Sequence, residues 1–268
     1  IFDHLFRSEN RQPGIKAVIV YPMNALINSQ TIELEGYKAN YEETTGNPFP
    51  ITFAQYTGQE KQDVREKIRE DLPDIILTNY MMLELILTRI QEKSIRDSIY
   101  NSIQFLVFDE MHTYRGRQGS DVAILIRRIK VKSENKINCI GTSATMVSGG
   151  TLKKQRLAVA NVATTFFGTS FEEGQIVNET LTRSFGSKQK IPSSSELVHC
   201  IQSSFSENGS ELELTNFALA HWLENRIALI EKEGILVRNR PQAFSEISEI
   251  LAKDSGLEVS KCSAQLII

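Results

Sequence analysis

The sequence predicts an α/β protein in which a parallel sheet flanked by helices is followed by a mainly helical module. In the first 150 residues, short β-branched runs such as KAVIVY alternate with longer helical patterns, which is typical of right-handed βαβ units. Most of these runs are apolar almost throughout, as expected for strands that are covered on both faces. After residue 170 the pattern changes to amphipathic helices.

The alternation of the two patterns gives the order of the elements. Strands are expected at residues 16–21, 51–56, 74–78, 104–109 and 137–141. Helical periodicity lies between them, at roughly 24–43, 59–71, 80–92 and 119–130. Because ligands in such sheets bind beyond the carboxyl ends of the strands, the polar residues that follow each strand are the candidates for a functional site.

Composition shifts divide the chain into a first domain at residues 1–170, a linker at 171–194 and a helical accessory module at 195–268. The segment GSKQKIPSSSE is rich in serine and poor in apolar residues, which indicates a linker. Helices are expected at 195–205, 214–234 and 241–256, the last with proline near its start and glycine at its end. His221 and Trp222 are interpreted as packing residues.

The composition is that of an ordinary globular protein. Hydrophobic residues make up 41% of the 268 residues and the formal net charge is −3, which argues against a protein that coats nucleic acid through its overall charge. No apolar run is long enough to cross a membrane, and no secretory leader opens the chain. Three scattered cysteines favour a cytoplasmic location. Cys139, in the apolar run INCIG, is expected to be buried.

The sequence FLVFDEMH places two adjacent carboxylates, Asp109 and Glu110, directly after a strand that is expected to be fully buried. Taken alone, the pair is explained more readily by a strand end with a solvated acidic turn. A basic run follows, in which six Lys or Arg residues oppose one Asp between positions 115 and 132. This run is either a local channel for nucleic acid or a solvated helix face. The other strand ends carry YPMNAL, YTGQ, TNYMML and GTSAT.

Taken together, these motifs resemble those of the superfamily 2 DExH-box helicases and translocases. VFDEMH resembles motif II, YPMNALINSQ motif Ia, YTGQ the TG element, ILTNYMMLE motif Ib and GTSATM motif III. The five occur in the family's order, and the resemblance covers roughly residues 1–170. It implies an incomplete RecA-like first motor domain. The extension HTYRGRQGSDVA is similar to the branch that contains bacterial DNA-repair and anti-phage defence helicases.

The resemblance assigns roles around ATP and Mg²⁺. Asp109 would hold Mg²⁺, through bound water, because this ion keeps part of its hydration shell. Glu110 would orient and deprotonate the attacking water. His112 would link the nucleotide site to motif III, where the hydroxyls of Ser143 and Thr145 suit a coupling element. A capping or turn role is the alternative for those two hydroxyls.

The resemblance also implies a track for single-stranded or unwinding duplex DNA along motifs Ia, TG and Ib. Such contacts grip phosphates without reading bases. The alternative for Asn24, Thr78 and Asn79 is helix capping, which is compatible with binding. The candidate contacts are Pro22, Asn24, Thr57, Gly58, Thr78, Asn79, Arg115 and Arg117.

One element of the family is absent from the sequence. No G-x-x-x-x-G-K-[ST] occurs, so the phosphate-cradling P-loop is missing, as is a second RecA-like domain. We therefore expect an internal piece of a longer ATP-dependent helicase, inactive alone, whose partners are DNA, the remainder of the parent and proteins of a defence or repair system. An RNA helicase and a catalytically inactive interaction module are the alternatives.

Overall fold

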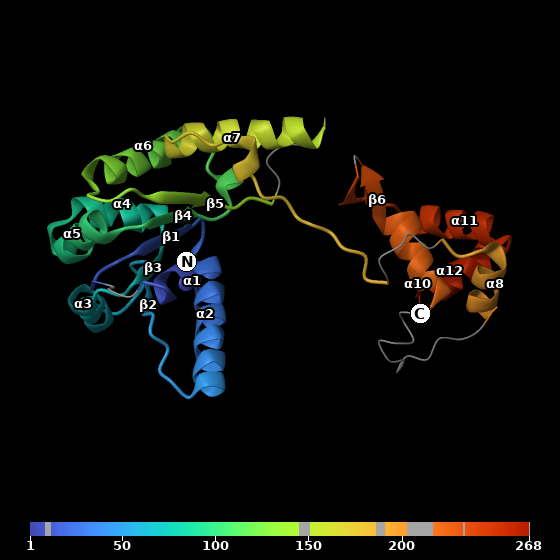
Figure 1. The fold of residues 1–268 in the computed structure, drawn as a ribbon, viewed down its shortest axis with the longest axis horizontal. Coiled ribbons are helices and arrows are strands. Elements are labelled where there is room, and N and C mark those ends of the chain that lie inside the picture. Colours follow the sequence, from blue (N-terminus) through green and yellow to red (C-terminus); the bar gives the residue numbers. More distant parts are fainter. Residues whose placement is uncertain (9–11, 145–150, 186–190, 203–216, 233, 268) are drawn as a thin grey trace. The chain divides into compact units, whose positions relative to one another are not determined.

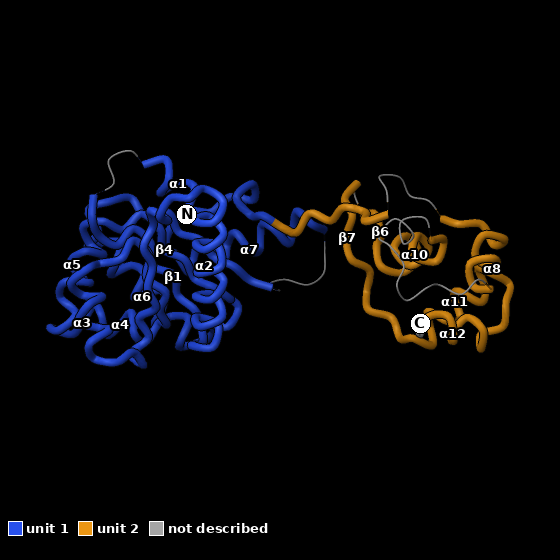
Figure 2. The backbone as a smooth tube through the Cα atoms, turned by 90° about the horizontal axis from the view of Figure 1, so that it is seen from below, with its two compact units in different colours: residues 1–177 blue, residues 178–268 orange. Residues whose placement is uncertain are grey.

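The computed structural model describes residues 1–8, 12–144, 151–185, 191–202, 217–232 and 234–267. The chain forms two compact units, residues 1–177 and 178–268 (Figure 2). None of the helices in these ranges has the length and hydrophobicity that a membrane crossing requires.

Unit 1 is built on a five-stranded parallel sheet with the order β2-β3-β1-β4-β5 (Figure 1). This sheet confirms the α/β prediction, and each strand lies within the range expected for it or one residue beyond. The connections between parallel strands run through helices, as βαβ units require. The strands are β1 (Ala17–Tyr21), β2 (Phe53–Gln55), β3 (Ile75–Asn79), β4 (Phe105–Phe108) and β5 (Asn138–Gly141).

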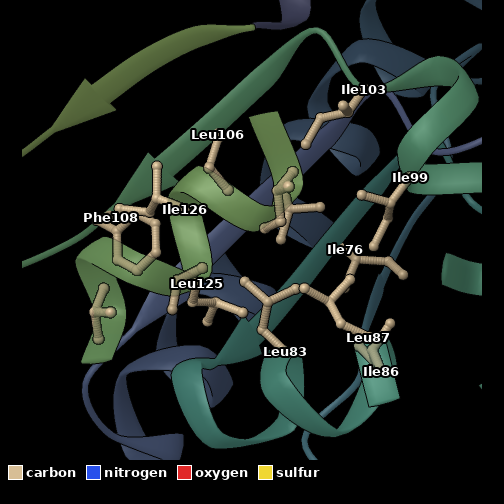
Figure 3. Packing of buried hydrophobic residues seen from close by; sticks show 14 of the residues in the cluster. Ile76, Leu83, Ile86, Leu87, Ile99, Ile103, Leu106, Phe108, Leu125 and Ile126 are labelled. Atoms are coloured by element: carbon tan, nitrogen blue, oxygen red, sulfur yellow. The ribbon is translucent and has the colours of Figure 1, made fainter. Parts of the chain in front are cut away.

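The two faces of the sheet are covered by different helices, because successive side chains of a strand point to opposite faces. Val18 lies in the larger core, together with Ile76 and Leu106 (Figure 3). This core is covered by α4 (Tyr80–Thr88), α5 (Lys93–Ser102), α6 (Gly116–Lys132) and α7 (Leu152–Phe167). The strand neighbours Ala17 and Ile75 lie in a second core against α1 (Phe2–Phe6) and α2 (Asn24–Thr45). Burial on both faces explains why the inner strands β1, β3 and β4 are largely apolar.

The helices of unit 1 differ from the expected ones around α4. The helix expected at 80–92 ends at Thr88, because Arg89 takes an extended conformation with φ −81° and ψ 141°. A 3-10 turn (Ile90–Glu92) follows, and then α5, which had not been expected as a separate helix. The sequence of α5 is rich in Ser, Asp and Asn, which are weak helix formers. The helix is held by tertiary packing, with Ile95 and Ile99 fully buried. The remaining helix, α3 (Gln62–Asp71), follows β2.

The expectation that Cys139 is buried was wrong. It is half-buried, because β5 is an edge strand and most of its residues are exposed. Burial nevertheless raises the pKa of its thiol above the ordinary value, against the opposing effect of Lys130.

In its described residues, unit 2 contains mainly helices and a hairpin. Its helices are α8 (Ser194–Gln202), α10 (Ala218–Trp222), a π-helical turn (Leu223–Ala228), α11 (Phe244–Ser255) and α12 (Val259–Ile267). The prediction of a continuous helix at 214–234 was wrong; residues 214–216 of that range lie outside the described residues. Residues near the end of the range form β6 (Leu229–Lys232), which pairs antiparallel with β7 (Ile235–Arg238). Gly234, with φ 77°, turns the chain between the strands. Trp222 is fully buried and its indole donates to Asp254, in keeping with a packing role.

Candidate active site and nucleic-acid interface

Asp109 and Glu110 follow β4 at the carboxyl edge of the sheet. Glu110 has a left-handed backbone with φ 50° and ψ 50°, which costs a non-glycine residue about 1–2 kcal/mol. Its N–H donates to Thr142 Oγ1 at 3.1 Å, and the Thr142 hydroxyl donates in turn to an Asp109 carboxylate oxygen. One side chain from the end of β5 therefore holds both carboxylate residues in place.

Thr142 had not been singled out from the sequence, although the hydroxyl-rich GTSAT motif had. The pairing of Phe108 with Gly141 in the parallel register brings the next residues, Asp109 and Thr142, side by side. The approach of the two strands is close. A Cβ atom on Gly141 would lie 1.9 Å from the Met111 sulfur, so any larger residue here would force the Met111 side chain to move.

His112 connects motif II to motif III. Its Nδ1 lies 3.1 Å from Glu110 Oε2 and 3.2 Å from Ser143 Oγ. A neutral imidazole uses Nδ1 either as a donor, toward the carboxylate, or as an acceptor of the serine proton. The ring thus has two hydrogen-bonding states, one favouring each neighbour. Thr145 lies outside the described residues.

The charge of Asp109 acts on two neighbouring tyrosines. Burial, and after it the negative charge of Asp109, raises the pKa of Tyr21 to about 12. The same two causes, in the same order, raise the pKa of Tyr114. Both phenols therefore stay neutral at physiological pH.

The side chains at this edge suit Mg²⁺, which is held partly by water and phosphate, better than an ion that needs several protein ligands. Within the described ranges, no three Asp, Glu, His or Cys side chains are grouped so as to hold a metal ion. Mg²⁺ is usually held by one or two carboxylates together with water and substrate phosphates, which fits the single Asp109 carboxylate. Glu110 Oε2 is shielded from solvent and receives no well-aligned hydrogen bond from a described residue. The Glu110 side chain as a whole is 36% exposed, so the rest of the carboxylate is open to water.

Motifs Ia and Ib are joined by their asparagines. The Asn79 amide donates to Asn24 Oδ1 at 2.8 Å, and Asn79 Oδ1 accepts the N–H of Met82, which caps α4. Asn24 is half-buried, and so is Pro22, two residues before it. Thr78 is fully buried, and its hydroxyl donates to the carbonyl of Tyr56 at 2.6 Å. Thr78 therefore supports the interface from beneath and offers no surface of its own.

The TG element is a turn between β2 and α3. The N–H groups of Thr57 and Gly58 and the Thr57 hydroxyl all donate to the Glu60 carboxylate. Gly58 has φ 87°, a conformation that favours glycine. Thr57 is half-buried and Gly58 is exposed, so the turn lies at the surface.

A buried polar cluster lies directly before this turn. The Tyr56 hydroxyl donates to Glu92 Oε2 at 2.6 Å, and Arg69 donates to both Glu92 oxygens at 3.1 and 3.3 Å. Glu92 is 2% exposed. Burial, followed by the hydrogen bond to Glu92, raises the pKa of Tyr56 to about 12. The sequence had given no reason to select Glu92 or Arg69.

Some residues of the basic run bond to neighbouring helices, whereas others lie near motif II and are exposed. Arg127 and Lys130 donate to carbonyl groups at the end of α7 and just beyond it, where cations are favoured by the helix dipole. Arg128 pairs with Glu84 at 2.5 Å. Arg115 donates to the His112 carbonyl at 2.7 Å and is exposed, as is Arg117.

The chain is similar in sequence to known helicases. The sequence profile described as DEAD/DEAH box helicase matches residues 1–151, which is more than half of the chain. The Druantia protein DruE of Escherichia coli (strain UMEA 4076-1) is 35% identical over 94 residues, 31% of this chain and 5% of that protein. The uncharacterized ATP-dependent helicase YprA of Bacillus subtilis (strain 168) is 32% identical over 115 residues, 43% of this chain and 14% of that protein.

The chain thus spans a small part of the length of these relatives. Among solved structures, Mycobacterium smegmatis helicase Lhr bound to ssDNA and AMP-PNP matches with a TM-score of 0.45 and 22% identity. That match covers 54% of this chain and 19% of the other.

Proposed function

Because this chain belongs to the DEAD/DEAH box helicase family, we propose that it provides part of the first motor domain of an ATP-dependent helicase or translocase. The full-length protein would couple ATP hydrolysis to movement along single-stranded DNA or to unwinding. DNA is chosen over RNA because the motif II extension resembles the DNA-repair and defence branch. One of the relatives, YprA, is named as an ATP-dependent helicase.

The observation that carries the proposal is the arrangement at the ends of β4 and β5. Asp109 and Glu110 are fixed by one hydroxyl, that of Thr142, while His112 stands between Glu110 and Ser143. A solvated acidic turn has no need of a left-handed glutamate whose neighbours are held in this way. The arrangement suits a carboxylate that must meet a reacting water at a defined position.

Each residue has a proposed role in the reaction. Bound ATP with Mg²⁺ would supply the phosphoryl group and the charge neutralisation that its transfer needs. Asp109 would position the ion through water, and Glu110 would orient and deprotonate the attacking water. His112 would then report the state of Glu110 to Ser143, since its Nδ1 serves only one of the two at a time. Thr145 would take part in the same coupling.

The nucleic-acid side lies along the ends of β1, β2 and β3. We propose that backbone amides and side chains of motifs Ia, TG and Ib hold successive phosphates, with the exposed arginines extending the track. The hydrogen bond between Asn24 and Asn79 keeps two of these motifs together, and Thr78 supports them. The proposed contacts are Pro22, Asn24, Thr57, Gly58, Asn79, Arg115 and Arg117.

The first experiment measures ATP hydrolysis by the full-length protein with single-stranded DNA, with RNA of the same sequence and without nucleic acid. Glu110→Gln should lower DNA-stimulated turnover by roughly 10²–10⁴-fold, because it removes the base and keeps the shape. Glu70→Gln, an exposed change on α3, is the matched control and should behave as wild type.

The outcomes separate the alternatives. If RNA stimulates ATP turnover more strongly than DNA, RNA is the substrate. No turnover from a folded protein under any condition would refute the motor and favour a catalytically inactive interaction module.

A further inference from the structure

The TG turn already holds an anion, and that anion belongs to the chain itself. The N–H of Thr57 lies 3.0 and 2.9 Å from the two oxygens of Glu60, and the N–H of Gly58 lies 2.9 Å from Oε2. The Thr57 hydroxyl donates to Oε1 at 2.6 Å. Both carboxylate oxygens are therefore engaged by three neighbouring donors of the turn.

These donors suit a phosphate as well as a carboxylate. Successive backbone N–H groups in a turn form a concavity that binds anions, and each N–H carries a single hydrogen to donate. The positive φ of Gly58 helps the two amides to converge. A phosphate oxygen and the Glu60 carboxylate cannot occupy the same donors, and their like charges repel each other.

The Glu60 side chain is able to leave. Its residue is only half-buried, and the adjacent Gly58 and Gln59 are exposed. In the part of the chain that the structure describes, no Lys or Arg forms a salt bridge with it. Replacing its carboxylate by a phosphate would exchange one set of charge-assisted hydrogen bonds for another.

We propose that Glu60 is a built-in competitor for nucleic-acid phosphate at the TG turn. Its carboxylate fills the donors of Thr57 and Gly58 when no strand is bound and swings out when a phosphate enters. This inference rests on the proposed function, because it concerns the same nucleic-acid track. For a protein that steps along a strand, a side chain that retakes the donors would help to release each phosphate.

The test is the binding of a fluorescently labelled single-stranded oligodeoxythymidylate to the chain at fixed salt, followed by fluorescence anisotropy. Glu60→Gln replaces the charged competitor with a weaker neutral acceptor, and the dissociation constant should fall by about 3- to 10-fold. Glu66→Gln is the matched control. It makes the same charge change on α3, where Glu66 accepts a hydrogen bond from Gln62 and does not bond to the turn.

A second variant distinguishes occupation of the turn's donors by residue 60 from the effect of its negative charge. Glu60→Asp keeps the net charge but is one methylene too short to reach the donors in the same way, so it too should bind DNA more tightly than wild type. Weaker or unchanged binding in both Glu60 variants would overturn the proposal and make Glu60 an organiser of the turn. An equal gain from Glu66→Gln would assign the effect to overall charge.

The same measurement distinguishes the two proposals. Binding by wild type without a gain in the Glu60 variants would refute only the role of Glu60. Binding by none of the proteins, all of them folded by circular dichroism, would refute the nucleic-acid track as well.

Discussion

The two halves of the sheet's carboxyl edge are held by opposite means. At β2 and β3, the supporting polar groups are buried: Thr78 is inaccessible, and Glu92 is enclosed between Tyr56 and Arg69. At β4 and β5, the corresponding groups are open to solvent. Thr142 is exposed, and Glu110 keeps 36% of its side chain accessible.

This difference predicts what substitutions will do in each half. A buried, fully satisfied polar network makes a region rigid, and removing one member leaves the others unpaired at high cost. Exposed hydrogen bonds contribute little to stability but still fix the position of a reacting group. We therefore expect changes under β2 and β3 to affect folding, and changes at β4 and β5 to affect local geometry and chemistry.

Glu92→Ala should have the largest effect on stability. It removes the only acid of the buried cluster and leaves the Arg69 guanidinium, 16% exposed, without its partner. Breaking a buried ion pair in this way costs about 3–5 kcal/mol. Peptide-resolved hydrogen exchange should show faster exchange in β2, β3 and α3.

Two results would contradict the claim that the buried cluster makes the β2 and β3 half of the sheet edge rigid. One is unchanged exchange in β2 and β3. The other is an equal effect from the control Glu70→Ala, since Glu70 is exposed on the same helix as Arg69. Peptides from α11 provide the reference for exchange conditions.

Gly141→Ala should have an intermediate effect, confined to the other half. The new Cβ would overlap the Met111 sulfur, and overpacking of this kind typically costs about 1–3 kcal/mol. The Met111 side chain must move, and we expect the adjacent backbone of Glu110 to shift with it. Hydrogen exchange should rise in residues 105–116, and DNA-stimulated turnover by the full-length protein should fall.

Shortening the neighbour provides the control. Adding Met111→Ala removes the overlapping atom and should restore part of the exchange protection that Gly141→Ala loses. If Gly141→Ala alone leaves both readouts at the wild-type level, the close approach of β4 and β5 does not constrain motif II.

The strands and the carboxylate pair could be predicted because their signals are local. Most strands of the large sheet lie in short, largely apolar runs, and Asp109 and Glu110 come directly after one of them. The register between strands is not local. It placed Thr142 beside Asp109, whereas the sequence had directed attention to Ser143 and Thr145 in the same motif.

Long-range pairing and weak local preference account for the remaining misses. Glu92 meets Tyr56 and Arg69 from 36 and 23 positions away, and no periodicity marks such a pair. In unit 2, the residues before Gly234 fit a helical pattern, but pairing of Leu229–Lys232 with Ile235–Arg238 makes them a strand. For short segments, tertiary contacts outweigh propensity.

Asn79 offers the smallest and most selective test, because its two side-chain atoms serve different purposes. Its oxygen caps α4 through the N–H of Met82, and its nitrogen donates to Asn24. Asn79→Asp keeps an acceptor for the cap and loses the donor, whereas Asn79→Ala loses both. Loss of a cap costs about 1 kcal/mol, so only the alanine variant should speed exchange at the start of α4. Both variants should weaken binding of the oligodeoxythymidylate if the tie to Asn24 holds the interface together. Normal binding by Asn79→Asp would show that capping alone is what this residue provides, and the buried support under β3 would then be sufficient to position the motif.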